Sequence, residues 1–160
     1  MYFISDKTAA VRALQKMLGV PETGRIDRGM AEKIEKITGS PFTGVVSYTD
    51  FPVIKKAYRK RKAARLVRDA LGIDASGSNG GRYTRDEMEK INQLLAKCIK
   101  ENRLEAYPPR GRFYTSLTAT AVREVRKMLM LPEGDEIDVE LLYRLMLNLR
   151  VKEKYNYTLN

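Results

Sequence analysis

The sequence predicts an all-α protein made of small helical units joined by short extended loop segments. Apolar residues recur at the spacing of one helical face, as in Val11, Leu14 and Leu18, and Pro21 with Gly24 ends that pattern. A similar helix-loop-helix stretch occurs about three times along the chain. Only short apolar segments, such as 44–46 and 112–114, suit an extended backbone. We therefore expect at most a few residues of strand.

An internal repeat is the strongest signal. Ala10–Asp27 aligns without gaps onto Ala121–Asp138, at an offset of 111 residues, and ten of the eighteen positions are identical. A middle copy is weaker: Ala64–Ile73 resembles the first helix and is followed by a longer, glycine-rich loop. Each copy is expected to place an amphipathic helix, a loop and a second amphipathic helix in that order.

The apolar positions of these helices are predicted to form the core. In the middle copy the expected core includes Leu66, Val67 and Ala70, and the return helix contributes Met88 to Ile99. Cys98, the only cysteine, has Leu94, Leu95 and Ile99 as neighbours, which favours a buried thiol over a reactive one.

A Gly-Arg-apolar triplet occurs three times, as 24–26, 81–83 and 111–113. The glycine permits positive φ at a turn, and we expect the apolar residue (Ile26, Tyr83 and Phe113) to fill the space between helices. This interpretation makes the triplet a structural device and not a ligand site.

The first copy resembles the three-helix peptidoglycan-binding-like domain of bacterial wall hydrolases, phage lysins and tail proteins. Val11-Arg12-Ala13-Leu14-Gln15 matches the first helix of that family, and Thr23-Gly24-Arg25-Ile26 and Thr43-Gly44-Val45-Val46-Ser47 match its two loops. Phe51 and Ile54 stand where the family places tryptophan and leucine. Threonine replaces both loop aspartates, so the resemblance implies the fold more strongly than the glycan ligand.

This resemblance implies tandem diverged units of peptidoglycan-binding-like type. We place unit 1 at residues 1–58, unit 2 at 59–117 and a partial unit 3 at 118–160.

The net charge of +10 is concentrated in one segment. Eight cations lie between Phe51 and Arg68, and removing these eight from the 30 basic residues leaves 22, against 20 acidic residues. Such a segment attracts a polyanion or an acidic protein face. The candidate binding residues are Lys55, Lys56, Arg59, Lys60, Arg61, Lys62 and Arg65. The alternative is a solvated linker helix whose side chains cover apolar neighbours.

The sequence has few candidates for a general acid or base, because the chain has no histidine and therefore no side chain with an ordinary pKa near neutrality. The acids around Asp138 suit an exposed helix start. We expect no catalytic residue, no metal site and no cofactor.

The preferred hypothesis is a non-catalytic structural or binding component of a bacteriophage virion, in the tail, baseplate or neck. Its expected partners are other virion proteins in a multi-copy assembly, with cell-wall glycan as a further candidate. The alternative is a basic nucleic-acid-binding protein, because paired short helices are compatible with helix-turn-helix docking. The residues near Met1 lack the basic and apolar regions of a secretory signal, and no apolar run is long enough to span a bilayer. We expect synthesis in a host cytoplasm, a virion location and no membrane.

Overall fold

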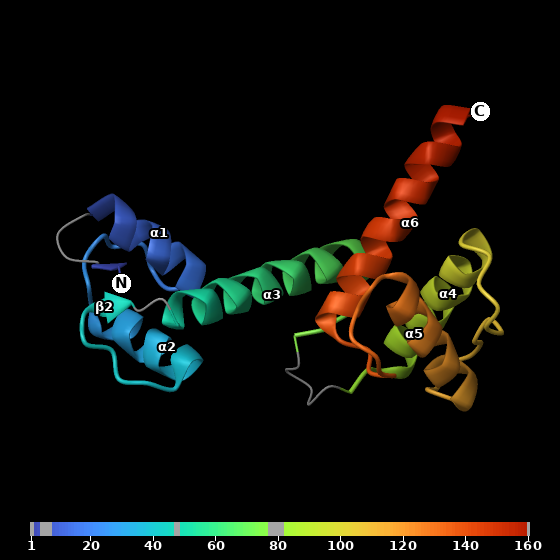
Figure 1. The fold of residues 1–160 in the computed structure, drawn as a ribbon, viewed down its shortest axis with the longest axis horizontal. Helices are drawn as coiled ribbons and strands as arrows, with labels where there is room; N and C mark the ends of the chain where they lie inside the picture. The colour runs from blue at the N-terminus through green and yellow to red at the C-terminus, as the bar shows by residue number, and fades with distance from the viewer. Residues whose placement is uncertain (1, 4–7, 47–48, 77–81, 160) are drawn as a thin grey trace. The chain divides into compact units, whose positions relative to one another are not determined.

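The computed structural model describes residues 2–3, 8–46, 49–76 and 82–159, and this part of the chain is all-α, as predicted (Figure 1). Its helices are α1 (Thr8–Leu18), α2 (Arg28–Thr38), α3 (Asp50–Leu71), α4 (Arg85–Glu101), α5 (Ser116–Met128) and α6 (Val139–Leu159). The only strands among the described residues are β1 (Tyr2–Phe3) and β2 (Val45–Val46). They pair antiparallel, with Tyr2 opposite Val46.

The chain divides into two compact units, residues 1–62 and residues 63–160, and α3 runs across the boundary. The predicted boundary after residue 58 lies close to this division. The assignment of residues 1–58, 59–117 and 118–160 to peptidoglycan-binding-like units stays a prediction.

The first unit is built on α1, α2 and the beginning of α3 (Figure 1). Its core consists of seven buried residues: Val11, Leu14, Leu18, Met30, Ile34, Val46 and Ile54. Phe42 and Phe51 pack against them from the edge. The spacing of the apolar positions on α1 therefore predicted its buried face correctly.

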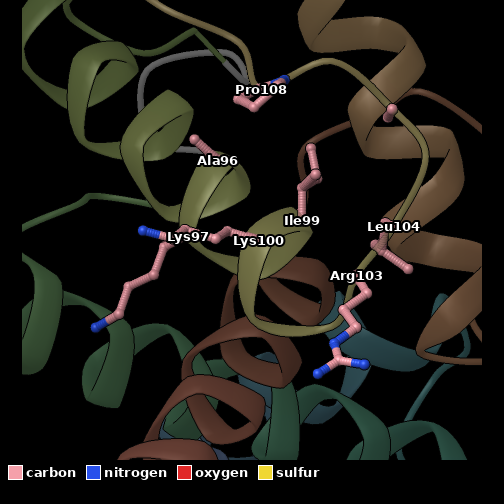
Figure 2. Close-up of a pocket in the computed structure, with 8 residues that line it drawn as sticks. Ala96, Lys97, Ile99, Lys100, Arg103, Leu104 and Pro108 are labelled. Atoms are coloured by element: carbon pink, nitrogen blue, oxygen red, sulfur yellow. The ribbon is translucent and has the colours of Figure 1, made fainter.

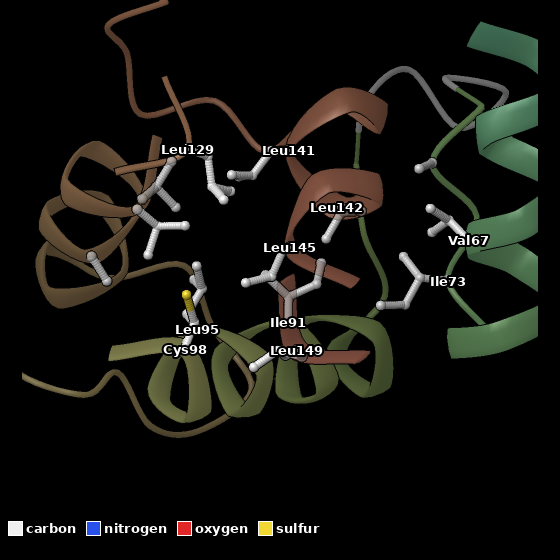
Figure 3. Packing of buried hydrophobic residues seen from close by; sticks show 14 of the residues in the cluster. Val67, Ile73, Ile91, Leu95, Cys98, Leu129, Leu141, Leu142, Leu145 and Leu149 are labelled. Atoms are coloured by element: carbon white, nitrogen blue, oxygen red, sulfur yellow. The ribbon is translucent and has the colours of Figure 1, made fainter. Parts of the chain in front are cut away.

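The second unit has a larger core, to which the end of α3 and residues of α4, α5 and α6 as far as Leu149 contribute (Figure 3). Ile91, Leu95, Leu142 and Leu145 are completely buried in it. Cys98 is also buried, as expected, and it faces the same cluster. Segments far apart in the sequence thus share one apolar interior.

The α1–α2 and α5–α6 connections have the same backbone design. We call each such helix-loop-helix connection a corner. α1 is followed by Gly19 at φ 71°, and α5 ends before Met130, which has the equivalent position and a φ of 60°. In each corner the next N–H donates back into the helix, from Val20 to Gln15 O at 3.1 Å and from Leu131 to the Arg126 O at 2.8 Å. This hydrogen bond around a left-handed residue is the Schellman ending of a helix.

The interior of each corner is held by one buried polar side chain. Gln15 donates from Nε2 to the Arg25 carbonyl at 2.9 Å. At the equivalent position, Arg126 donates from Nη1 to the Glu136 carbonyl at 3.2 Å. Each carbonyl lies ten residues after its donor in the sequence. A glutamine in one corner and an arginine in the other therefore donate to equivalent loop carbonyls.

The second helix of each corner begins at an equivalent aspartate. Asp27 Oδ1 accepts from Met30 N at 2.8 Å, and Asp138 Oδ1 accepts from Leu141 N at 2.8 Å. These contacts supply an acceptor for an otherwise unpaired N–H at the helix start. The sequence repeat is therefore a repeat of hydrogen bonds as well as of apolar positions.

The middle corner, from α3 to α4, keeps parts of this design. Gly72 follows α3 at φ 67°, as Gly19 follows α1. α4 begins with a capping box, in which Thr84 accepts from Glu87 N and the Glu87 carboxylate accepts from Thr84 N. Its connecting loop includes residues 77–81, which lie outside the described residues.

Two of the predicted core positions were wrong. Leu66 and Ala70 are exposed, because the buried face of this part of α3 passes through Ala64, Val67 and the half-buried Leu71. For segment 112–114, where either a small strand or an extended turn was expected, the structure has bends at 112 and 113 and no strand.

The triplet prediction holds only in part. Gly24 and Gly111 have positive φ, as expected, but Ile26 is 43% exposed and Phe113 is 59% exposed. The buried side chains of Gln15 and Asn92 donate to backbone carbonyls of these two loops. The loops are therefore held without an apolar side chain between the helices. Tyr83 does pack against the core of the second unit. Gly81 lies outside the described residues.

Candidate polyanion-binding surface

The basic segment forms one long helix, as its composition predicts. α3 has 22 residues, with Asp50 in its first turn and Arg68 in its last turn, where each complements the helix dipole. Pro52 falls in the first turn, where a missing N–H costs no intrahelical hydrogen bond. Lysine, arginine and alanine, which favour helices, make up much of the remainder.

The apolar residues of α3 position its cations. Ile54 is buried in the core of the first unit, while Ala64 and Val67 are buried in that of the second. The other faces of the helix carry the basic side chains. All seven predicted binding residues are exposed: Lys55, Lys56, Arg59, Lys60, Arg61, Lys62 and Arg65.

Arg61 differs from the other six. Its Nη2 donates to the carbonyl oxygens of Met17 at 2.8 Å and Lys16 at 3.2 Å, at the end of α1. Its guanidinium also lies 5.7 Å from the centre of the Tyr58 ring. Arg61 therefore binds backbone carbonyls in the last turn of α1, which is a structural role that sequence spacing did not reveal.

The remaining six cations have no carboxylate partner among the described residues. Lys55, Arg59 and Lys62 follow i, i+4 and i+7 spacing, so they share one face, and Lys56 and Lys60 form a second i, i+4 pair. We call these six residues (Lys55, Lys56, Arg59, Lys60, Lys62 and Arg65) the α3 basic surface.

Concentrating this charge has an energetic cost. Like charges at i, i+4 destabilise a helix by about 0.2–0.5 kcal/mol per pair. The α3 basic surface contains two such pairs, Lys55 with Arg59 and Lys56 with Lys60. A bound polyanion removes this repulsion, so the arrangement favours binding to repeated negative charge.

A second cationic feature was not singled out from the sequence. A groove of about 570 Å³ opens beside the end of α4, with Lys97, Lys100 and Arg103 among its lining residues (Figure 2). The three-residue spacing of these cations beside buried Cys98 and Ile99 was its only sequence signal.

The described residues contain no group of three or more histidine, cysteine, aspartate or glutamate side chains arranged to hold a metal ion. Among the described helices, none combines the length and the apolarity needed to cross a bilayer.

The chain matches no protein-family model, and neither a curated protein nor a solved structure is significantly similar to it.

Proposed function

We propose that this chain is a non-catalytic structural and binding component of a bacteriophage virion, built from peptidoglycan-binding-like modules and docking through the α3 basic surface. The observation that carries the binding role is a set of six exposed cations on one helix that have no carboxylate partner within the described part of the chain. The virion setting rests on the resemblance of the first copy to modules found in phage tail proteins and lysins.

The repeated geometry supports the modular part of the proposal. Gly44 at φ 89° precedes α3, and Gly111 at φ 86° precedes α5. α3 then acts as the third helix of one module and the first helix of the next, and α5 does the same one module later.

The virion role is tested on purified particles. Mass spectrometry of particles from a phage that encodes this chain should detect it, and purified peptidoglycan should retain it in a pull-down. Absence from both the particle and the wall fraction contradicts the proposal.

A second candidate is nucleic-acid binding, which the spacing of the α3 basic surface favours. Six phosphate contacts give a slope of about −5 in a plot of log K against log salt concentration. Fluorescence anisotropy with a labelled DNA duplex, titrated at several concentrations between about 50 and about 300 mM NaCl, measures this slope.

A matched pair of variants separates a local surface from general charge. Arg59→Ala with Lys62→Ala should reduce the magnitude of the slope by about two. Lys36→Ala with Lys127→Ala removes the same charge from exposed positions outside α3 and should change the slope much less. DNA binding that does not respond to salt, or that both variants weaken equally, rules out the α3 basic surface as a nucleic-acid site.

A further inference from the structure

The middle of α3 lacks the apolar contacts that fix the helix on either side of it. Ile54 is buried in the first core, and the next buried residues along the helix are Ala64 and Val67, in the second core. Each residue from 55 to 62 is exposed or half-buried. We call residues 55–62 the α3 middle segment. Because helices in proteins owe most of their stability to a packed apolar face, this segment depends mainly on its backbone hydrogen bonds.

The charge of the α3 middle segment opposes its helix. Six of its eight residues are lysine or arginine, and none is acidic. Lys55 with Arg59 and Lys56 with Lys60 are like charges one turn apart, an arrangement that destabilises a helix. Salt or a bound anion reduces such repulsion between exposed charges. The helical state of the segment is therefore sensitive to the ions around it.

One tertiary contact holds the segment. Arg61 donates to the carbonyl oxygens of Met17 and Lys16, and its guanidinium lies 5.7 Å from the centre of the Tyr58 ring. Within the described part of the chain, the five other cations of the segment have neither a side-chain hydrogen bond nor a carboxylate partner. All five belong to the α3 basic surface. The binding surface and the least supported part of α3 are thus largely the same residues.

We propose that polyanion binding is coupled to the helical state of the α3 middle segment, an inference that rests on the polyanion role of the α3 basic surface. In the free chain at low ionic strength, charge repulsion opens the segment locally, and opening disperses the cations that the helix holds in rows. A bound polyanion removes the repulsion and contacts these rows, so it closes the segment. The coupling is reciprocal, because whatever favours the helix also favours binding.

Amide hydrogen exchange of the free, full-length chain tests the first half of the coupling. The backbone N–H groups of residues 59–62, followed by NMR, should exchange faster than those of α4 at about 20 mM NaCl. At about 300 mM NaCl their exchange should slow about threefold or more, because salt screens the repulsion. The amides of α4 should respond much less and serve as the internal control. Exchange at residues 59–62 that does not respond to salt overturns the proposal.

A charge reversal within the segment tests whether repulsion is the cause. Lys56→Glu places an acid one turn before Lys60, in the orientation that favours a helix, and should slow exchange of the same amides about twofold to fivefold at low salt. Lys127→Glu, at an exposed position of α5, makes the same change of net charge and is the matched control. Equal effects of the two substitutions overturn the proposal.

Ala57→Gly tests local opening without a change of charge. Glycine disfavours a helix relative to alanine, so exchange of the segment amides should rise by up to about fivefold. By reciprocity, the same substitution should weaken binding of a DNA duplex by up to about fivefold. Ala70→Gly, at an exposed position in the last turn of α3, is the matched control and should change neither quantity. Equal duplex affinities of the two variants overturn the coupling.

Exchange measured on the complex tests the second half. A saturating DNA duplex at about 20 mM NaCl should slow exchange at residues 59–62 at least as much as added salt does. A duplex that binds through the α3 basic surface but leaves this exchange unchanged overturns the coupling and leaves the polyanion role intact. A duplex that does not bind, while salt and Lys56→Glu still slow exchange, contradicts the polyanion role and the coupling with it.

Discussion

At the scale of single residues, Gln15 and Arg126 show how a corner is kept while its chemistry changes. Gln15 is fully buried, accepts from Gly24 N at 3.0 Å and donates to the Arg25 carbonyl. A larger residue does not fit at Gly24, because its Cβ atom would lie 2.5 Å from Thr8 Cγ2 and because Gly24 has a φ of 76°. Gln15 therefore supplies the acceptor for the Gly24 N–H, while Thr23 Oγ1 also donates to the Arg25 carbonyl at 3.2 Å.

Gln15→Ala should lower the free energy of unfolding by about 2 kcal/mol, because it leaves the buried Gly24 N–H without its acceptor. Urea unfolding followed by circular dichroism measures the change. Gln93→Ala, at an exposed position of α4, is the control and should shift stability by less than about 0.5 kcal/mol. Equal effects of the two substitutions contradict a structural role for Gln15.

Tyr83 links the second and third copies, because its hydroxyl donates to the Ile137 carbonyl at 2.6 Å. Burial, together with the negative charges of Asp138, Glu87 and Asp74, raises the pKa of Tyr83 from 10.0 to about 12. The folded chain thus retains this proton at a pH where the unfolded chain has released it.

This pKa shift predicts an alkaline loss of stability. The contribution is fully present below pH 10.0 and is lost as the pH rises to about 12, because the unfolded state alone releases the proton in that window. Tyr83→Phe should flatten the fall of unfolding free energy with pH, measured by urea titrations between these values. Tyr107→Phe, at a 78% exposed ring, is the control. An unchanged pH dependence in Tyr83→Phe disproves the linkage.

At the scale of elements, the cations of α3 form one run in the sequence but have two different roles in the structure. Arg61 binds the end of α1, whereas the α3 basic surface has no such contact within the described residues. Gly19 belongs to the same arrangement, because a Cβ atom there would lie 2.6 Å from Arg61 Nη1.

Arg61→Ala should lower the free energy of unfolding by about 1 kcal/mol, since it removes charge-assisted hydrogen bonds from an exposed side chain. Lys62→Ala removes the same charge at the neighbouring position and should leave stability within about 0.5 kcal/mol of wild type. Thermal unfolding of the two variants at equal ionic strength distinguishes them. If Lys62→Ala is the more destabilised, the two roles are assigned wrongly.

At the scale of the whole molecule, two apolar cores serve two compact units. Ile34 is buried in the first core and Leu142 in the second. Each unit thus has an interior of its own, as an independent cooperative element requires.

Ile34→Ala and Leu142→Ala should each cost about 2–5 kcal/mol, the usual range for a truncated core side chain. Native-state hydrogen exchange should show faster exchange in α1 and α2 for the first variant, and in α4 to α6 for the second. The double variant should show the sum of the two effects. Accelerated exchange throughout the chain in either single variant contradicts two separate units.

Much of the fold followed from the sequence, because local patterns govern helices. The apolar spacing located the buried faces of α1, α4 and α5, and the repeat predicted that Asp27 and Asp138 have equivalent places. Side-chain contacts across helices were less predictable. Ile26 and Phe113 occupy the apolar position of their triplets, yet both are exposed, because polar side chains from a neighbouring helix hold those loops.

The sequence by itself determined an all-α chain with a repeated corner and a cationic helix, since periodicity, capping residues and net charge act locally. Only the tertiary structure decided which cations are available. Arg61 faces backbone carbonyls 44 and 45 residues away, and Lys100 with Arg103 borders a groove that forms when the 102–108 segment folds back on α4. Such contacts depend on packing between residues distant in the chain, which no local pattern encodes.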